Sequence, residues 1–151
     1  MEESFTITKR QVIAAFFART LLGIIFLMQG FGKVFTWGMV GVYENVFKSY
    51  EIMLPSFLLK VLAYYTSYIE LIAGVLLIIG LFRNYALYAL GSVLLIVAFG
   101  HGMAQPIWDL SHVFPRAILL IIILVMPISW DKWNLDYLIY RKNATFKPRN
   151  K

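Results

Sequence analysis

The sequence contains no cysteine and few charged residues, since only 15% of its 151 residues are Asp, Glu, Lys or Arg. The missing thiols exclude disulfides, thiolate nucleophiles and cysteine-ligated metal or iron–sulfur sites. The low charge excludes an ordinary soluble domain, in which about 25% of residues are charged. Because 60% of the residues are hydrophobic, the composition is typical of an integral membrane protein.

Signature motifs of several enzyme classes are also missing. The sequence has no Walker loop, no GxGxxG, no GxSxG and no HExxH motif, each of which marks a known binding or catalytic site. The apolar segments contain no paired acids, which argues against a hydrolase that works with two carboxylates. What is present instead is a series of long apolar stretches.

Four apolar segments predict membrane-spanning helices, because a span needs about 20 residues. They cover residues 12–35, 56–82, 84–105 and 113–130, and Pro127 is expected to kink or end the last one. The runs 76–79 and 117–125 lack the alternation of a barrel strand. We therefore expect an all-α integral membrane protein, a single domain whose four transmembrane helices form an antiparallel bundle.

The connection between the first two segments predicts a short amphipathic helix. Tyr43, Phe47, Tyr50 and Leu54 share one helical stripe. Such a helix would lie at the membrane surface. An ordinary extramembrane loop is the alternative interpretation.

Basic residues predict the orientation. Lys9, Arg10, Arg83 and Lys132 fall on one side of a four-span arrangement, together with a basic tail over residues 131–151. Both termini are therefore expected to be cytoplasmic. The net charge of +6 comes with no nucleic-acid-binding motif, so we expect no nucleic acid partner.

The first segment carries a polar stripe. Arg19, Gly23, Phe26, Gly30 and Lys33 are separated by four, three, four and three residues, which places them on one helix face. A charge facing lipid costs roughly 3 kcal/mol, so this face is predicted to point into the bundle. Small residues there let helices approach closely. The predicted helix-packing glycines are Gly23, Gly30, Gly74 and Gly91.

Glu70 in the second segment is the predicted partner of Arg19. At 1.5 Å rise per residue, their offset along the helix axes is roughly 7 to 8 Å, which an extended arginine can cover. A buried ion pair is therefore expected. It is either structural, fixing the register of two helices, or coupled to a proton or ligand.

Seven polar residues form a candidate pocket that opens outward, away from the cytoplasmic side. A lone intramembrane histidine is often only a structural hydrogen-bonded residue, whereas cations beside a histidine and Trp108 favour a head-group, quinone or small-anion site. The two histidines and Asp109 lack a recurring ligand spacing, so no metal site is predicted. The candidate pocket residues are Gln29, Lys33, His101, Gln105, Asp109, His112 and Arg116.

These motifs resemble the DoxX family of small four-span bacterial membrane proteins. The resemblance rests on Arg19-x-x-x-Gly23-x-x-Phe26, Gly30-x-x-Lys33 and Glu70 with Gly74 and the Gly80 turn. It implies a left-handed four-helix bundle in the bacterial inner membrane. It also implies a link to membrane redox chemistry, since the family includes the DoxD-like subunit of thiosulfate:quinone oxidoreductase and members of oxidative-stress complexes. Its characteristic polar positions are Arg19, Lys33 and Glu70.

The functional expectation is a membrane subunit or anchor of a redox or oxidative-stress-related complex, with quinone as a candidate cofactor. The lack of cysteine departs from some redox relatives and leaves at most a non-thiol subunit of a quinone-linked oxidoreductase. Expected partners are the lipid bilayer and either another protein or a second copy of the chain. The alternatives are a non-catalytic scaffold or assembly factor and, third, a small transporter, which the absence of a convincing inverted repeat disfavours.

Overall fold

The computed structural model describes residues 7–104 and 111–145, and in these ranges the chain forms helices and no strand. This confirms the all-α class. The helices are α1 (Lys9–Phe31), α2 (Gly38–Val42), α3 (Ser56–Ile79), α4 (Arg83–Ala104), α5 (Phe114–Val125) and α6 (Leu135–Thr145). Tighter or wider helical turns lie between them: η1 (Gly32–Trp37), η2 (Tyr43–Phe47), η3 (Lys48–Ile52) and η4 (Ile128–Trp130).

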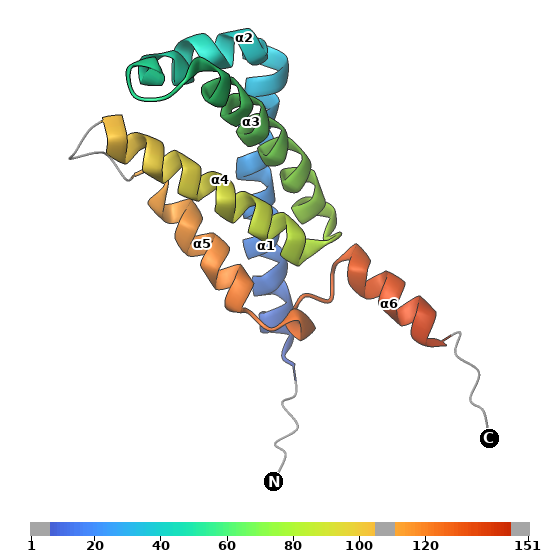
Figure 1. Ribbon diagram of the computed structural model, residues 1–151. Coiled ribbons are helices and arrows are strands. Elements are labelled where there is room, and N and C mark those ends of the chain that lie inside the picture. Colours follow the sequence, from blue (N-terminus) through green and yellow to red (C-terminus); the bar gives the residue numbers. More distant parts are fainter. Residues whose placement is uncertain (1–6, 105–110, 146–151) are drawn as a thin grey trace.

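Three helical stretches are long and apolar enough to cross a membrane: Lys9–Ile52, Ser56–Ile79 and Arg83–Ala104. α1 packs along α3, α3 contacts α4, and α5 contacts both α1 and α4 (Figure 1). The apolar side chains that these helices share form the core. Its fully buried members include Leu22, Phe26, Leu77, Leu87 and Leu90.

The fourth apolar segment contains a shorter helix than expected. α5 has 12 residues, a length of about 18 Å at 1.5 Å per residue, and the chain leaves the helical conformation at Met126, whose ψ is 129°. Pro127 explains this end, because a proline disfavours helical geometry in the residue before it. The predicted segment 113–130 is therefore helical only to Val125, and the expectation that Pro127 would kink or end it is confirmed; an extended pair of residues and η4 follow.

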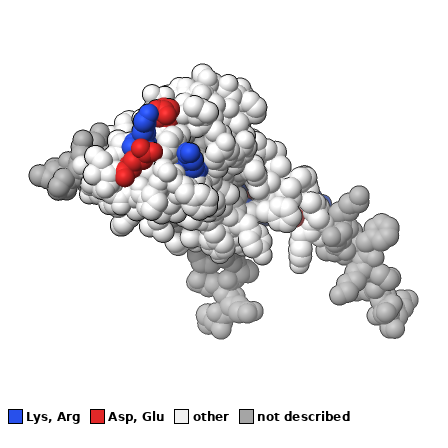
Figure 2. Space-filling model, turned by 45° about the horizontal axis from the view of Figure 1, so that its top comes forward, with Lys and Arg blue, Asp and Glu red and all other residues white. Residues whose placement is uncertain are grey.

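The connection between the first two spans is helical rather than an ordinary loop. Gly38, with φ of +67°, redirects the chain so that α2 turns away from the axis of α1 (Figure 1). Val42 is buried, whereas Glu44 and Lys48 are exposed and form an ion pair at 2.5 Å. Figure 2 shows the charged side chains gathered at this end of an otherwise largely uncharged surface. We call residues 38–54 the surface segment.

The α3–α4 turn depends on a glycine. Gly80 ends α3 with φ of +69°, a left-handed conformation that glycine adopts at no steric cost. A Cβ atom at this position would also overlap Asn134 and lie 3.0 Å from Nη1 of Arg19. The turn therefore brings the end of α3 against residues 131–134, which the sequence analysis assigned to a basic tail.

Candidate functional site

Three glycines allow the backbones of α1 and α3 to touch. A Cβ atom on Gly30 would overlap the backbone nitrogen of Leu71 and lie 2.6 Å from its Cα. A Cβ atom on Gly74 would lie 2.5 Å from the backbone nitrogen of Leu27, and one on Gly23 would lie 3.0 Å from the carbonyl oxygen of Gly74. We call this contact the glycine seam.

Gly91 takes no part in close packing. A Cβ atom on this residue would have no heavy atom of another part of the structure within 4 Å. The prediction that Gly91 is a helix-packing glycine is therefore wrong. The helical stripe correctly groups residues on one face of α4, but it does not show whether a neighbouring helix covers each point of that face.

Arg19 is the centre of a buried polar cluster at one end of the seam. Its Nε lies 3.0 Å from Oδ2 of Asp131, and the two side chains are 1% and 2% exposed. Its Nη1 donates to the carbonyl oxygens of Leu77 and, at 2.9 Å, Ile78, and its Nη2 donates to that of Trp133 at 2.7 Å. Leu77 and Ile78 lie in the last turn of α3, where carbonyls have no partner four residues on within the helix; the Leu77 carbonyl also accepts from the backbone nitrogen of Gly80 at 3.2 Å.

Arg83 approaches the same aspartate from the start of α4. Its Nη2 donates to the carbonyl oxygens of Ile123 and, at 3.0 Å, Met126, at the end of α5. Its Nη1 lies 4.0 Å from Oδ2 of Asp131. Two arginines thus bind the carboxyl ends of two helices, where the helix dipole favours positive charge. We call Arg19, Arg83 and Asp131 the arginine cluster.

The predicted Arg19–Glu70 pair does not form. Arg19 binds the carbonyl of Leu77, which lies seven residues beyond Glu70 and therefore roughly 10 Å farther along α3. Asp131 supplies the counter-charge instead. Hydropathy gave no sign of this, because Asp131 follows the last apolar segment and there resembles a solvent-exposed acid.

Glu70 pairs with Lys33 at the other end of the seam. Lys33 Nζ lies 2.7 Å from Glu70 Oε2, and the side chains are 19% and 4% exposed. Arg116 of α5 also acts electrostatically on Glu70. Oε1 of Gln29 and Oγ of Ser67, one turn away on the same two helices, are buried and have no hydrogen-bond partner in the described part of the chain.

The structure divides the predicted outward pocket. Lys33 and Arg116 both act on Glu70, whereas His101 lines a separate cavity. His112 is exposed before α5. None of the described candidates Gln29, Lys33, His112 and Arg116 lines the cavity beside His101, and Gln105 and Asp109 lie outside the described residues.

The cavity beside His101 has a volume of about 420 Å³ and lies between the surface segment, α3 and α4. Its walls are almost entirely aliphatic and aromatic, with Phe47, Leu58 and Leu95 among them. Tyr50 and His101 are the side chains with hydrogen-bonding groups on these walls. A Cβ atom on Gly100 would lie 4.0 Å from Oη of Tyr50, so Tyr50 reaches the turn of α4 that carries His101.

Within residues 7–104 and 111–145, no group of three or more metal-ligating side chains comes together. The site residues that sequence reasoning missed are Asp131, Asn134 and Tyr50. Asp131 and Asn134 follow the last apolar segment, and Tyr50 was interpreted only as part of an amphipathic stripe. A pattern of spacing along one helix could not have paired any of them with its neighbours.

Comparison with known proteins gives one match. The DoxX family model matches residues 14–102, which is more than half of the chain and includes Arg19, Lys33, Glu70 and His101. No curated protein and no solved structure matches the chain. The match agrees with the motifs at Arg19, Gly30 and Glu70, and with three helices able to cross a membrane. The chain belongs to the DoxX family.

Proposed function

We propose that this chain is a membrane subunit or anchor of a redox or oxidative-stress-related complex, and that it binds a quinone in the cavity beside His101. The observation that carries the proposal is the apolar cavity of about 420 Å³ with two hydrogen-bonding side chains on its walls. Ligand pockets of this type are largely apolar, with a few placed polar groups, and measure about 300–1,000 Å³.

The chemistry of the cavity fits the parts of a quinone. A quinone ring carries two carbonyl oxygens, which accept hydrogen bonds, and a long apolar tail. The Tyr50 hydroxyl and the ring N–H of His101 are hydrogen-bond donors, and aliphatic residues such as Leu58 and Leu95 provide apolar contacts for the tail. The surface segment closes one side of the cavity through Phe47 and Tyr50.

The chain's own side chains limit its part in any redox reaction. Without cysteine it has no thiol to exchange with a disulfide. A redox role therefore requires a partner protein that carries the electrons, while this chain holds the quinone and anchors the partner at the membrane. This is why we propose a subunit rather than a complete enzyme.

We further propose one domain with four spans in an antiparallel bundle, with both termini cytoplasmic in the bacterial inner membrane. The count of four spans is supported by three long apolar helices and by α5, which contacts α1 and α4. The extended residues and η4 after α5 add length to the fourth crossing. The basic residues Lys9, Arg10, Arg83 and Lys132 support the orientation.

A non-catalytic scaffold or assembly factor is the second candidate. The glycine seam and the arginine cluster favour it, because both explain intramembrane polar and small residues by packing alone. Under this proposal the quinone-sized cavity would hold only lipid chains. The two proposed functions therefore differ in whether substitutions of His101 and Tyr50 lower the amount of bound small molecule.

The test is native mass spectrometry of the protein in lipid particles prepared from quinone-containing membranes. We expect bound quinone in the parent protein, and about tenfold less in His101→Ala and Tyr50→Phe, since each lost hydrogen bond weakens binding by about 1 kcal/mol or somewhat more. His112→Ala is the matched control, because His112 is exposed and does not line the cavity. Parent protein that carries a partner but no quinone would favour the scaffold.

A further inference from the structure

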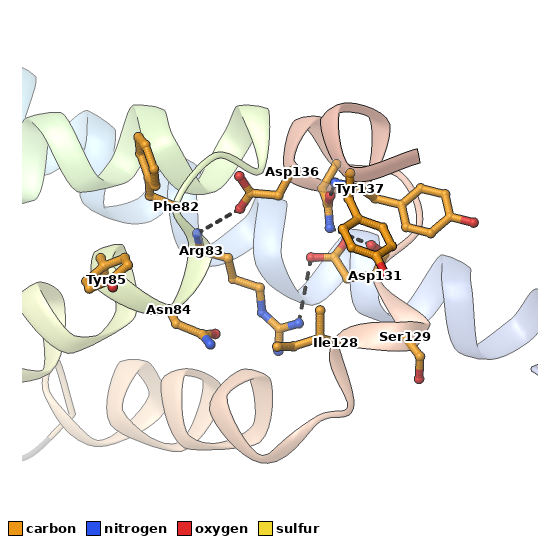
Figure 3. A pocket seen from close by; sticks show the side chains of 11 residues that line it. Phe82, Arg83, Asn84, Tyr85, Ile128, Ser129, Asp131, Asp136 and Tyr137 are labelled. Atoms are coloured by element: carbon orange, nitrogen blue, oxygen red, sulfur yellow. Dashed lines mark hydrogen bonds and ion pairs between the residues drawn. The ribbon is translucent and has the colours of Figure 1, made fainter. Parts of the chain in front are cut away.

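A second cavity, of about 560 Å³, lies where α4 begins, beside the chain between α5 and α6 (Figure 3). Its walls come from the first residues of α4, from η4 and from the first turns of α6. It shares Arg83 and Asp131 with the arginine cluster and no residue with the cavity beside His101. Its walls combine three charged side chains, Arg83, Asp131 and Asp136, with several aromatic rings, and the buried Asp131 is already paired with Arg19.

The positive group is Arg83. Its side chain is 5% exposed, and Nη2 is bound to carbonyls at the end of α5. Its Nε and Nη1 donate no hydrogen bond within the part of the chain that the structure describes. Asp131, its nearest acid, is bound mainly by Arg19 at 3.0 Å and lies 4.0 Å from Arg83. The charge of Arg83 is thus incompletely compensated.

The negative group is Asp136, in the first turn of α6. Its Oδ2 accepts a long hydrogen bond of 3.4 Å from the backbone nitrogen of Arg83, and the residue is partly exposed. Aromatic rings line the cavity: Phe82 and Tyr85 precede and begin α4, and Tyr137 follows on α6 (Figure 3). Tyr140 of α6 also lines it. A carboxylate among aromatic faces favours a cation.

We propose that this cavity binds the headgroup of a phospholipid that carries a primary amine. The ammonium lies at Asp136 among the tyrosine rings. The phosphate lies at the opposite wall, where Asn84 and Ser129 offer hydrogen-bond donors and the buried Arg83 attracts it through its charge. A zwitterionic headgroup matches Arg83 and Asp136, since Asp131 is paired with Arg19, whereas a purely anionic headgroup leaves Asp136 facing another negative group.

The surroundings identify a lipid as the source of this headgroup. Phe82 and Ile128 on the cavity walls are 56% and 62% exposed, and both lie where apolar helices begin or end; in the proposed four-span arrangement this level borders the acyl chains of the bilayer. Aromatic side chains concentrate at this level of membrane proteins. A lipid places its headgroup in the cavity and its chains along these residues, which a free zwitterion cannot do.

The experiment places the purified protein in particles with equal amounts of phosphatidylethanolamine, phosphatidylcholine and phosphatidylglycerol, and identifies retained lipids by native mass spectrometry. We expect phosphatidylethanolamine to be enriched about tenfold over phosphatidylglycerol, and the enrichment to disappear in Asp136→Asn. Glu51→Gln, at an exposed acid of the surface segment, is the matched control and should keep the enrichment.

Equal retention of the three lipids, or preferential retention of phosphatidylglycerol, would overturn the proposal. So would free O-phosphoethanolamine binding to delipidated protein as strongly as the lipid does. Tyr140→Leu provides a second variant that leaves both charges in place. Tyr140 is 74% exposed, so the fold should tolerate its loss, and we expect a severalfold smaller preference for phosphatidylethanolamine over phosphatidylcholine.

Discussion

Two buried cation–carboxylate groups lie at opposite ends of the glycine seam, and they differ in how many partners hold the cation from the first helical stretch. Arg19 binds Asp131 and three backbone carbonyls. Lys33, 14 residues and roughly 21 Å farther along the helical axis, binds Glu70 and keeps a side chain that is 19% exposed. All three nitrogens of the Arg19 guanidinium are used, whereas Lys33 has one acidic partner; polar atoms without a hydrogen-bond partner occur at both ends in the described residues, on Arg83 and Asp131 at the first and on Gln29 and Ser67 at the second.

This difference indicates a structural role for the arginine cluster and allows an exchange of partners at Lys33 and Glu70. A guanidinium that holds the ends of α3 and the segment 131–134 together cannot release them without disrupting the fold. Lys33 and Glu70 make one contact with each other, so either can take another partner while the helices stay packed. A proton- or ligand-coupled role therefore remains a proposal for the Lys33–Glu70 pair, and the arginine cluster is best explained as structural.

The largest effect is expected from Arg19→Met. Asp131 would stay buried with only the distant Arg83, which typically costs about 3–5 kcal/mol, and three carbonyls would lose their hydrogen bonds from the guanidinium. Folded protein should be largely lost in a detergent thermal-unfolding assay. Arg10→Met, at an exposed position, is the control. Near-parental stability of Arg19→Met would contradict a structural arginine cluster.

Gly30→Ala should have the next largest effect. The added Cβ atom overlaps the backbone of Leu71, so α1 and α3 must separate, and we expect a loss of about 1–3 kcal/mol. Gly91→Ala is a matched control, because its Cβ meets open space and alanine favours a helix by about 0.5–1 kcal/mol. A lower melting temperature for Gly30→Ala and a higher one for Gly91→Ala, each relative to the parent protein, would confirm the seam. Equal shifts would contradict it.

Glu70→Gln is expected to cost less, about 1–2 kcal/mol, because Lys33 is partly exposed and the amide can still accept a hydrogen bond. Asp131→Asn, measured alongside it, should cost more. Comparing the two melting temperatures tests directly whether the two ends of the seam differ. A Glu70→Gln variant that unfolds as readily as Asp131→Asn would place both groups in the same structural class.

The smallest effect should come from Lys48→Ala. Its ion pair with Glu44 is exposed on both sides, and such exposed pairs contribute little to stability because water and salt screen them. Thermal unfolding should barely change, and the small change should shrink further in high salt because the pair is screened. A shift as large as that of Glu70→Gln would show that the surface segment contributes more to stability than its exposure indicates.

The sequence predicted the features that depend on one helix at a time. The all-α class, the helical surface segment and the close approach at Gly23, Gly30 and Gly74 all follow from periodicity and residue size. The partner of Arg19 did not follow, because Asp131 lies 112 residues away outside any apolar segment. The division of the outward pocket was missed for a related reason: residues at equal depth can face different neighbours, and periodicity does not fix the rotation of one helix against another.

The distance in sequence between Arg19 and Asp131 also has a consequence for biosynthesis. At a translation rate of about 5–20 residues per second, the 112 residues that separate them take roughly 6 to 22 seconds to make. During that interval Arg19 is already part of the first helix, and its carboxylate partner does not yet exist. The arginine cluster can therefore close only after residue 131 has been made, so synthesis of the segment that follows α5 is itself a step in the maturation of the first helix.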